Sequence, residues 1–310
     1  FSKYDDVVVG YFDFPKGTFN QIAKTTTCNW QIGSQLQWLP CECAERVIFN
    51  TRQGVDLKSI IVDVNTGVER LISHPIYAVH PNGEVALGLN MQRLYFTRRA
   101  YSYDGDYEDM WRKEVVENDG IYQINLDSGT SDLLIRTQDI ASLDPMPNMR
   151  GALHWLDHPM FSPNGKIFLF YHRWLTKNGT FFSRLYTSES NGKRLYRYPD
   201  SGMYSHATWL SDNQFIVYSR LIESDIRYCQ KNLLWKRFFV EGLLPFYRRI
   251  NHINFVKNLR GRLLKDYYLL FSVGNERYQI IGQKKLTEDG HPSVCPICRN
   301  LLLLDTYPDS

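Results

Sequence analysis

Three histidines and one glutamine occupy the same position in a repeated part of this sequence. Each lies five residues before a turn, and the four are His158, His206, His291 and Gln35. In the remaining copy of the repeat the position holds Ile76. Neutral imidazole is a ligand for several divalent metals. The spacing therefore predicts a metal site made by these four side chains.

The repeated unit consists of a strand, a turn and a second strand. In its clearest copy, residues 156–174, an Asn-Gly pair separates two apolar segments, which is a strong hairpin signal because the tight turn needs positive φ. Similar units occupy 35–50, 76–90, 204–220 and 290–307. Such repetition indicates the blades of a β-propeller around a central channel. We predict one all-β propeller domain over residues 1–310, with the four metal candidates around one mouth of the channel.

Bulk properties exclude several classes of protein. The chain has 310 residues and a formal net charge of only +3, so we expect no nucleic-acid partner. It lacks 18 consecutive apolar residues and does not begin with a signal peptide, so we expect a cytoplasmic protein. Six cysteines are too few to indicate a disulfide framework. Cys295 and Cys298 form one Cys-x-x-Cys, which alone is a weak zinc motif; two thiols flanking a turn is the simpler interpretation.

One segment, residues 222–266, differs from the blade pattern. It has ten Lys or Arg against four Asp or Glu, a net charge of +6, and several apolar residues at roughly helical spacing. We predict a helical, basic insertion. It either packs on the outside of the propeller or docks on a membrane surface or a protein partner.

Several short motifs together resemble the oligogalacturonate lyase-like β-propellers, and more closely uncharacterised bacterial relatives of that group. These motifs include His158-Pro-Met-Phe-Ser-Pro, Ser205-His-Ala-Thr-Trp209 and Asp289-Gly-His-Pro, together with His172-Arg-Trp174 and Asp305-Thr-Tyr-Pro-Asp309. The resemblance covers most of residues 19–309 outside the insertion. It implies a seven-bladed propeller, of which we expect this chain to carry an incomplete set of blades.

The resemblance also implies a reaction. Lyases of this family cut uronic-acid-containing oligosaccharides by β-elimination at a divalent metal, typically Mn²⁺, held by three histidines and a glutamine. Of the candidates only His206 matches a family metal histidine, through its His-x-x-Trp context. The substrate expected for this chain is accordingly an acidic oligosaccharide.

β-Elimination requires a base beside the carboxylate, a cation for the developing charge and an acid for the leaving oxygen. Arg173 or Arg220 would hold the carboxylate with a forked contact, and His172 or Tyr307 would act as base or acid. His172 and Tyr307 follow the second strand, so they could lie at the opposite mouth from the metal.

Two alternatives remain open from the sequence. Each histidine can instead bond the backbone of a neighbouring blade, since most side-chain hydrogen bonds go to backbone. The chain would then be a non-catalytic propeller that binds a glycan or a protein partner in polysaccharide biosynthesis, because propellers host many functions.

Overall fold

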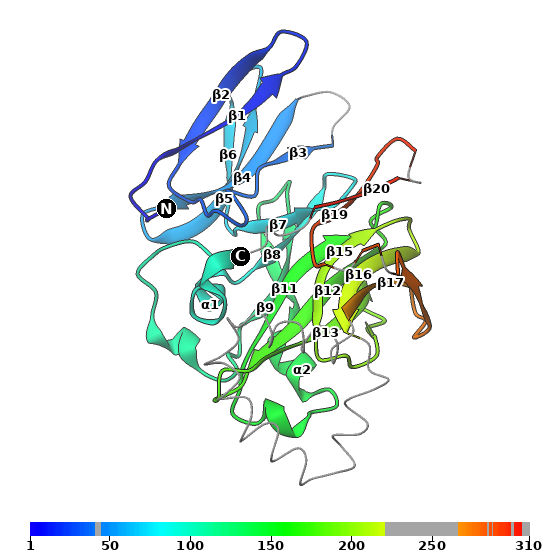
Figure 1. Ribbon diagram of the computed structural model, residues 1–310. Coiled ribbons are helices and arrows are strands. Elements are labelled where there is room, and N and C mark those ends of the chain that lie inside the picture. The colour runs from blue at the N-terminus through cyan, green and yellow to red at the C-terminus, as the bar shows by residue number, and fades with distance from the viewer. Residues whose placement is uncertain (41–44, 221–265, 284, 287, 299–300, 306–310) are drawn as a thin grey trace, which may run out of the picture. The chain divides into compact units, whose positions relative to one another are not determined.

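The computed structural model describes residues 1–40, 45–220, 266–283, 285–286, 288–298 and 301–305 (Figure 1). The chain forms two compact units, Phe1–Arg197 and Tyr198–Ser310, and each is described by itself. The prediction of one propeller domain over 1–310 therefore stays a prediction. Of the predicted insertion only Asp266 belongs to the described residues.

The first unit contains one hairpin and three four-stranded antiparallel sheets. The hairpin pairs β1 (Val7–Asp13) with β2 (Thr18–Thr25). The first sheet runs through β3 (Gln37–Leu39), β4 (Arg46–Gln53), β5 (Asp56–Asp63) and β6 (Glu69–Ile72). The second runs through β7 (Ile76–Val79), β8 (Val85–Leu89), β9 (Gly120–Asn125) and β10 (Ser131–Arg136). The third runs through β11 (Leu153–Phe161), β12 (Ile167–Leu175), β13 (Phe181–Glu189) and β14 (Tyr196–Arg197).

Helices are few and short in this unit. They are α1 (Met91–Thr97) and α2 (Thr137–Ser142), with 3₁₀ turns η1 (Arg99–Tyr101), η2 (Asp109–Arg112) and η3 (Pro147–Met149). Asn90 caps α1, because its side chain accepts a hydrogen bond from the Arg93 backbone. No helix among the described residues is long and apolar enough to cross a membrane.

The second unit contains one four-stranded sheet and one hairpin. The sheet runs through β15 (Tyr204–Trp209), β16 (Gln214–Arg220), β17 (Asp266–Ser272) and β18 (Tyr278–Ile281), and the hairpin pairs β19 (Pro292–Val294) with β20 (Leu302–Leu304). Arg220 and Asp266 are paired across β16 and β17. The two described residues that flank 221–265 in the sequence are thus paired with each other in the ladder.

All four larger sheets are meanders, in which each strand pairs with its neighbour in sequence. The chain is therefore an all-β protein of the β-propeller type, as the repeated units predict. The Asn-Gly turns lie where hairpins need them. Gly83 and Gly165 join the first two strands of their sheets with φ of +73° each, a conformation that favours glycine.

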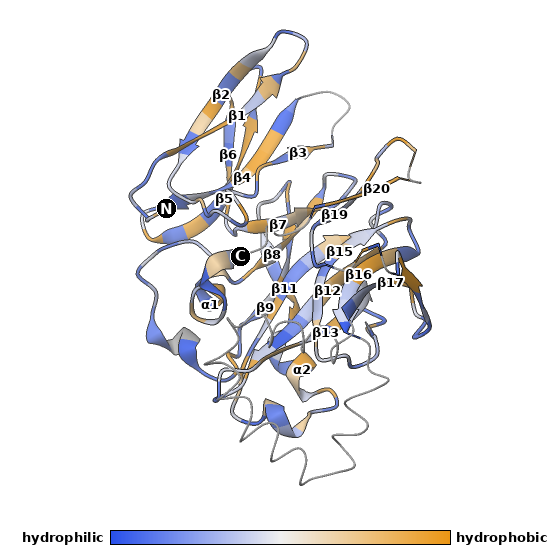
Figure 2. Cartoon of the chain, in the orientation of Figure 1, coloured by the Kyte–Doolittle hydropathy of each residue, from blue (hydrophilic) through white to orange (hydrophobic). Residues whose placement is uncertain are grey.

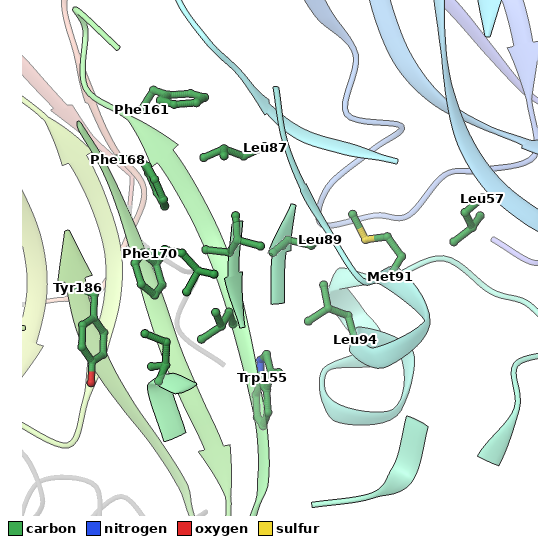
Figure 3. Close-up of a cluster of buried hydrophobic side chains, with 14 of the residues drawn as sticks. Leu57, Leu87, Leu89, Met91, Leu94, Trp155, Phe161, Phe168, Phe170 and Tyr186 are labelled. Carbon is green, nitrogen blue, oxygen red and sulfur yellow. The ribbon is translucent and has the colours of Figure 1, made fainter. Parts of the chain in front are cut away.

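Apolar residues follow many of the strands (Figure 2), and their buried side chains gather in core clusters. On β12 every residue from Phe168 to Trp174 is buried, which means that both faces of this strand are covered. In Figure 3 Leu87 of β8 lies near Phe168 of β12, in a cluster that also includes Leu89, Phe170 and Trp155. Burial on both faces is expected for strands packed between neighbouring blades.

Asn50 joins the first sheet to the second. Its side chain is fully buried and donates to the Ile76 carbonyl (2.9 Å) and the Tyr103 hydroxyl (2.8 Å). Its amide oxygen accepts from the Ile76 N–H (2.8 Å) and the Ser59 hydroxyl (2.9 Å). One amide therefore satisfies buried polar groups of β5, β7 and the loop after η1.

Replacing this amide tests the contact between the sheets. Asn50→Leu keeps the side-chain volume close but leaves the Ile76 carbonyl and the Tyr103 hydroxyl without their partner. We expect the free energy of unfolding to fall by about 3 kcal/mol, because each orphaned buried group costs about 1–3 kcal/mol. Urea denaturation measures it, and Asn65→Ala in an exposed turn should change it by less than about 0.5 kcal/mol. Equal effects would show that Asn50 does not hold the sheets together.

Candidate functional site

In three sheets the first strand is interrupted by a β-bulge at a corresponding place. The pairing shifts between Ile76 and Ala78 on β7, between Asp157 and Met160 on β11, and between Tyr204 and Ala207 on β15. A bulge inserts an extra residue and redirects its side chain. His158 and His206 lie in two of these bulges, as their shared spacing before the turn suggests.

The bulge also corrects the alignment in the second sheet. Counting back from the turn selects Ile76, but Ile76 is fully buried in the core. The extra residue of that bulge is Tyr77, whose ring lies 5.8 Å from the ring of His158. Tyr77 is thus a neighbour of His158 that the five-residue spacing before the turn did not select.

His158 lies in a strained backbone position with aromatic neighbours. Its φ is +53°, which is uncommon for a residue other than glycine. Rings of Tyr101 and Tyr171 lie 4.9 and 5.9 Å from its imidazole. Burial lowers its pKa, and Asp157 opposes this only in part. The imidazole is therefore held neutral, the form that binds metals.

Asp157 is a buried carboxylate that stays ionised. Burial alone would raise its pKa, but Arg173, His158 and Arg98 hold it well below the usual range. Its oxygens lie 2.7 Å from Arg173 Nε and 3.1 Å from Arg98 Nη1, and the Trp155 indole donates at 3.1 Å. Arg173 was predicted to hold a substrate carboxylate. It is nearly buried, and it already binds the carboxylate of Asp157. Its predicted catalytic role stays a prediction.

His172 lies in the core beside His154. His154 Nε2 is 3.1 Å from the Met149 carbonyl, so that nitrogen carries the proton and His154 Nδ1 accepts from His172 Nε2 at 2.9 Å. The remaining nitrogen of His172, Nδ1, is buried without a hydrogen-bond partner. Burial lowers the pKa of His172 well below its ordinary value. The predicted base or acid is fully buried, so its ring offers no surface to a substrate.

Gln35 occupies a different part of the first unit. Its φ is +55°, and it lines a cavity of about 390 Å³ together with Cys28, Ser34 and residues 7–10 of β1. His158 is not among the residues that line this cavity. The described contacts therefore do not bring Gln35 and His158 together.

The second unit brings two of the predicted histidines into contact. The rings of His206 and His291 have centroids 4.2 Å apart. His206 Nδ1 lies 3.0 Å from Asp289 Oδ1, and His291 Nδ1 lies 3.0 Å from Asp305 Oδ2. Ser205 donates to the other oxygen of Asp289 at 2.6 Å. Each imidazole therefore has its own carboxylate on the same ring nitrogen.

The two aspartates were not predicted as site residues, although both stand in the short motifs that carry the family resemblance. Asp289 precedes His291 by two positions, whereas Asp305 reaches it only through the pairing of β19 with β20. Hydrogen bonds from the His291 backbone and side chain lower the pKa of Asp305. The Asp305 carboxylate is accordingly an acceptor that fixes the orientation of His291.

The last two predicted catalytic residues are Arg220 and Tyr307, and only Arg220 belongs to the described residues. Arg220 makes a forked contact within its sheet, with Nε 2.8 Å and Nη2 3.1 Å from the two carboxylate oxygens of Asp266. Tyr307 falls outside the described residues. The arginine fork predicted for a substrate is thus made to a carboxylate of the protein itself.

A divalent cation is the implied cofactor, and the second unit offers part of a site for it. Metal-bound histidines commonly donate their second ring N–H to a carboxylate, and His206 and His291 both have this arrangement. Among the described residues no group of three or more His, Cys, Asp or Glu could hold a metal ion. His206 and His291 therefore fit two ligands of a divalent cation, and further ligands would be needed to complete its coordination.

Comparisons with known proteins identify no family by sequence. No family model matches the chain, and no curated protein matches it. Solved structures that resemble it include an oligogalacturonate lyase in complex with manganese, at 10% identity and a TM-score of 0.47 over 95% of this chain and 67% of that one. Tricorn protease matches at 13% and 0.37 over 58% of this chain, and an acylaminoacyl peptidase from Pyrococcus horikoshii at 8% and 0.38 over 80%. The chain spans only 15% and 33% of those two proteins.

Neutralising Asp157 should destabilise the first unit. In Asp157→Asn the buried Arg173 keeps its charge without a carboxylate, and breaking a buried pair in this way costs about 3–5 kcal/mol. Chemical denaturation measures the loss, with Asp132→Asn at the surface as the control. If both variants unfold at the same denaturant concentration as the wild type, the ion cluster contributes nothing to stability.

The burial of His172 predicts how the stability of the protein depends on pH. The folded-state pKa of His172 is depressed, so the unfolded chain binds its proton first, near pH 6.5, and stability falls as pH drops below that value. Between pH 7.5 and 5.5 His172 should account for about 1 kcal/mol of lost stability. Denaturation at both pH values should show a smaller loss for His172→Gln. An unchanged pH dependence in this variant would contradict the assignment.

Proposed function

We propose that this chain is a propeller-type lyase that cleaves uronic-acid-containing oligosaccharides by β-elimination, with His206 and His291 among the ligands of a divalent cation, Mn²⁺ in the first instance. The observation that carries the proposal is the pair of carboxylate-backed imidazoles 4.2 Å apart. The short motifs that resemble the oligogalacturonate lyase-like propellers supply the substrate class.

The chemistry of a uronate explains what the site must provide. A bound cation would polarise the carboxylate of the sugar and stabilise the charge that develops beside it. Asp289 and Asp305 hold the two imidazoles in one tautomer, so that their other nitrogens are the basic ones. The serine that donates to Asp289 fixes that carboxylate in turn. Tyr307, two residues after Asp305, remains the proposed proton carrier.

A second candidate is a non-catalytic propeller that binds a glycan or a protein partner. It is favoured by the internal engagement of the predicted catalytic side chains. Arg173 and Arg220 each bind a carboxylate of the protein, and His172 is buried. In that case the histidine pair would orient a ligand without transforming it. A protein or membrane partner for the 222–266 segment is likewise a proposal.

An elimination assay separates the two candidates. The chain is incubated with a panel of uronic-acid oligosaccharides, after chelation and after addition of Mn²⁺, and the ultraviolet absorbance of the unsaturated product is followed. We expect a Mn²⁺-dependent rise that falls at least about 100-fold in His206→Ala and His291→Ala. Loss of an outer-shell partner costs about 10–100-fold, so Asp289→Asn should lie in that range.

His80→Ala, a histidine of the first unit outside the pair, provides the matched control and should keep its rate. A rate that is unchanged in His206→Ala, or the absence of product with every substrate, would overturn the lyase. Saturable binding of one of the oligosaccharides without product would then establish the second candidate.

A further inference from the structure

A cluster of two arginines around one carboxylate lies wholly in the first unit. Arg173 Nε and Arg98 Nη1 contact different oxygens of Asp157, at 2.7 and 3.1 Å. Asp157 is buried and ionised, and the neighbouring His158 is neutral because burial lowers its pKa. The two guanidinium groups therefore share one negative charge, and these four residues together carry a net charge of +1.

Most of the donors of the two arginines are still available. Each guanidinium uses a single nitrogen on Asp157, and in the described part of the chain no other hydrogen bond engages either side chain. The remaining nitrogens are Nε and Nη2 of Arg98 and both Nη of Arg173. Among the described residues, the buried donors without a partner do not include these nitrogens, so solvent reaches them. This holds even for Arg173, of whose side chain only 4% is exposed.

Aromatic rings hold the arginines in place beside an apolar surface. The guanidinium carbon of Arg98 lies 4.0 Å from the centroid of the Tyr101 ring and 5.7 Å from that of the Phe181 ring. The guanidinium carbon of Arg173 lies 5.2 Å from the same Phe181 ring. Phe181 is 41% exposed, and 24% of the Arg98 side chain is exposed. The cluster thus combines fixed donors for an oxyanion with an exposed ring that can cover the C–H groups of a sugar.

We propose that Arg98 and Arg173 bind the carboxylate of a uronic acid residue, with the Phe181 ring against the sugar, as a binding subsite of the first unit. The planar guanidinium fork matches a carboxylate, and arginines already fixed in place lose little freedom on binding. The bound anion neutralises the net charge of the cluster. The choice of a uronic acid rests on the function proposed above, whereas the requirement for an oxyanion rests on the two arginines alone.

Calorimetric titration of the full chain tests the proposal, in a chelator so that no elimination consumes the ligand. Trigalacturonate is the ligand, galactotriose is its neutral counterpart, and inorganic phosphate supplies an oxyanion without a sugar. We expect trigalacturonate to bind, with an affinity that falls as the salt concentration rises. Galactotriose should bind at least about 10-fold more weakly, because hydrogen bonds to a charged group are the stronger ones. Phosphate that binds as tightly as trigalacturonate would overturn the assignment to a sugar acid.

Variants of Arg98 locate the binding. Arg98→Met keeps an unbranched stem between the two rings but removes the donors, so the affinity for trigalacturonate should fall at least about 10-fold. Arg98→Lys keeps the charge without the fork and should restore only part of the affinity. Arg99→Met is the matched control, because Arg99 is the next residue and binds Asp104, and it should keep the wild-type affinity. Circular dichroism shows whether each variant is folded.

His206→Ala separates the subsite from the lyase. This variant removes a proposed ligand of the cation in the second unit, and it should bind trigalacturonate as the wild type does. An affinity that is unchanged in Arg98→Met, or lost in His206→Ala, would overturn the subsite. If binding depends on Arg98 but no substrate gives product in the elimination assay, the lyase is overturned and the subsite stands, so the two failures are distinguishable.

Discussion

The ionised carboxylate of Asp157 is the constraint on which the first unit depends. A charge with only 1% of its side chain exposed is tolerated only if cations and donors surround it, and Arg173 and Arg98 provide this. Arg173 belongs to the adjacent strand, whereas Arg98 ends α1. Because Arg93 of α1 also donates to the His154 carbonyl, the helix is fixed to β11 at two points. The polar segment after α1 is also attached to the third sheet, because the His154 N–H donates to the Glu114 carbonyl at 2.9 Å.

The same carboxylate stands where the ladder of β11 breaks. The residue after it, His158, takes positive φ, and its ring turns toward Tyr77 and Tyr101 rather than into the alternation of the strand. Positive φ costs free energy, which the ion cluster and the surrounding rings must offset. Bulges recur in β7 and β15, so the repeat of the sequence specifies an interruption of the first strand as much as the strand itself.

Local sequence signals predicted the strands and turns, whereas contacts between distant residues could not be predicted. The turns and strands were predictable because Asn-Gly pairs and apolar runs are local, and the meandering sheets follow from them. Counting back from the turn selects Ile76 in the second sheet, whereas the extra residue of the β7 bulge is Tyr77, and a shift of one residue reverses the face of the strand. His172 has the residue type of a general base, but its burial depends on the packing of β12 and on His154, which no local pattern reveals. Asp305 reaches His291 across a strand pair, so only the fold shows that they are partners.

The environments of the five histidines His154, His158, His172, His206 and His291 divide them into two kinds. His154, His158 and His172 lie in the first unit, and burial lowers the pKa of all three, so at neutral pH they carry no charge and serve as hydrogen-bonding or packing groups. His206 and His291 keep partial access to solvent, with 16% and 53% of their side chains exposed, and each has a carboxylate on Nδ1. An imidazole oriented by a carboxylate and reachable from outside is what both metal binding and proton transfer require. Among the described histidines, His206 and His291 of the second unit therefore best meet the physical conditions for chemistry. His158 lies in an equivalent bulge, but its buried environment resembles that of the structural histidines His154 and His172.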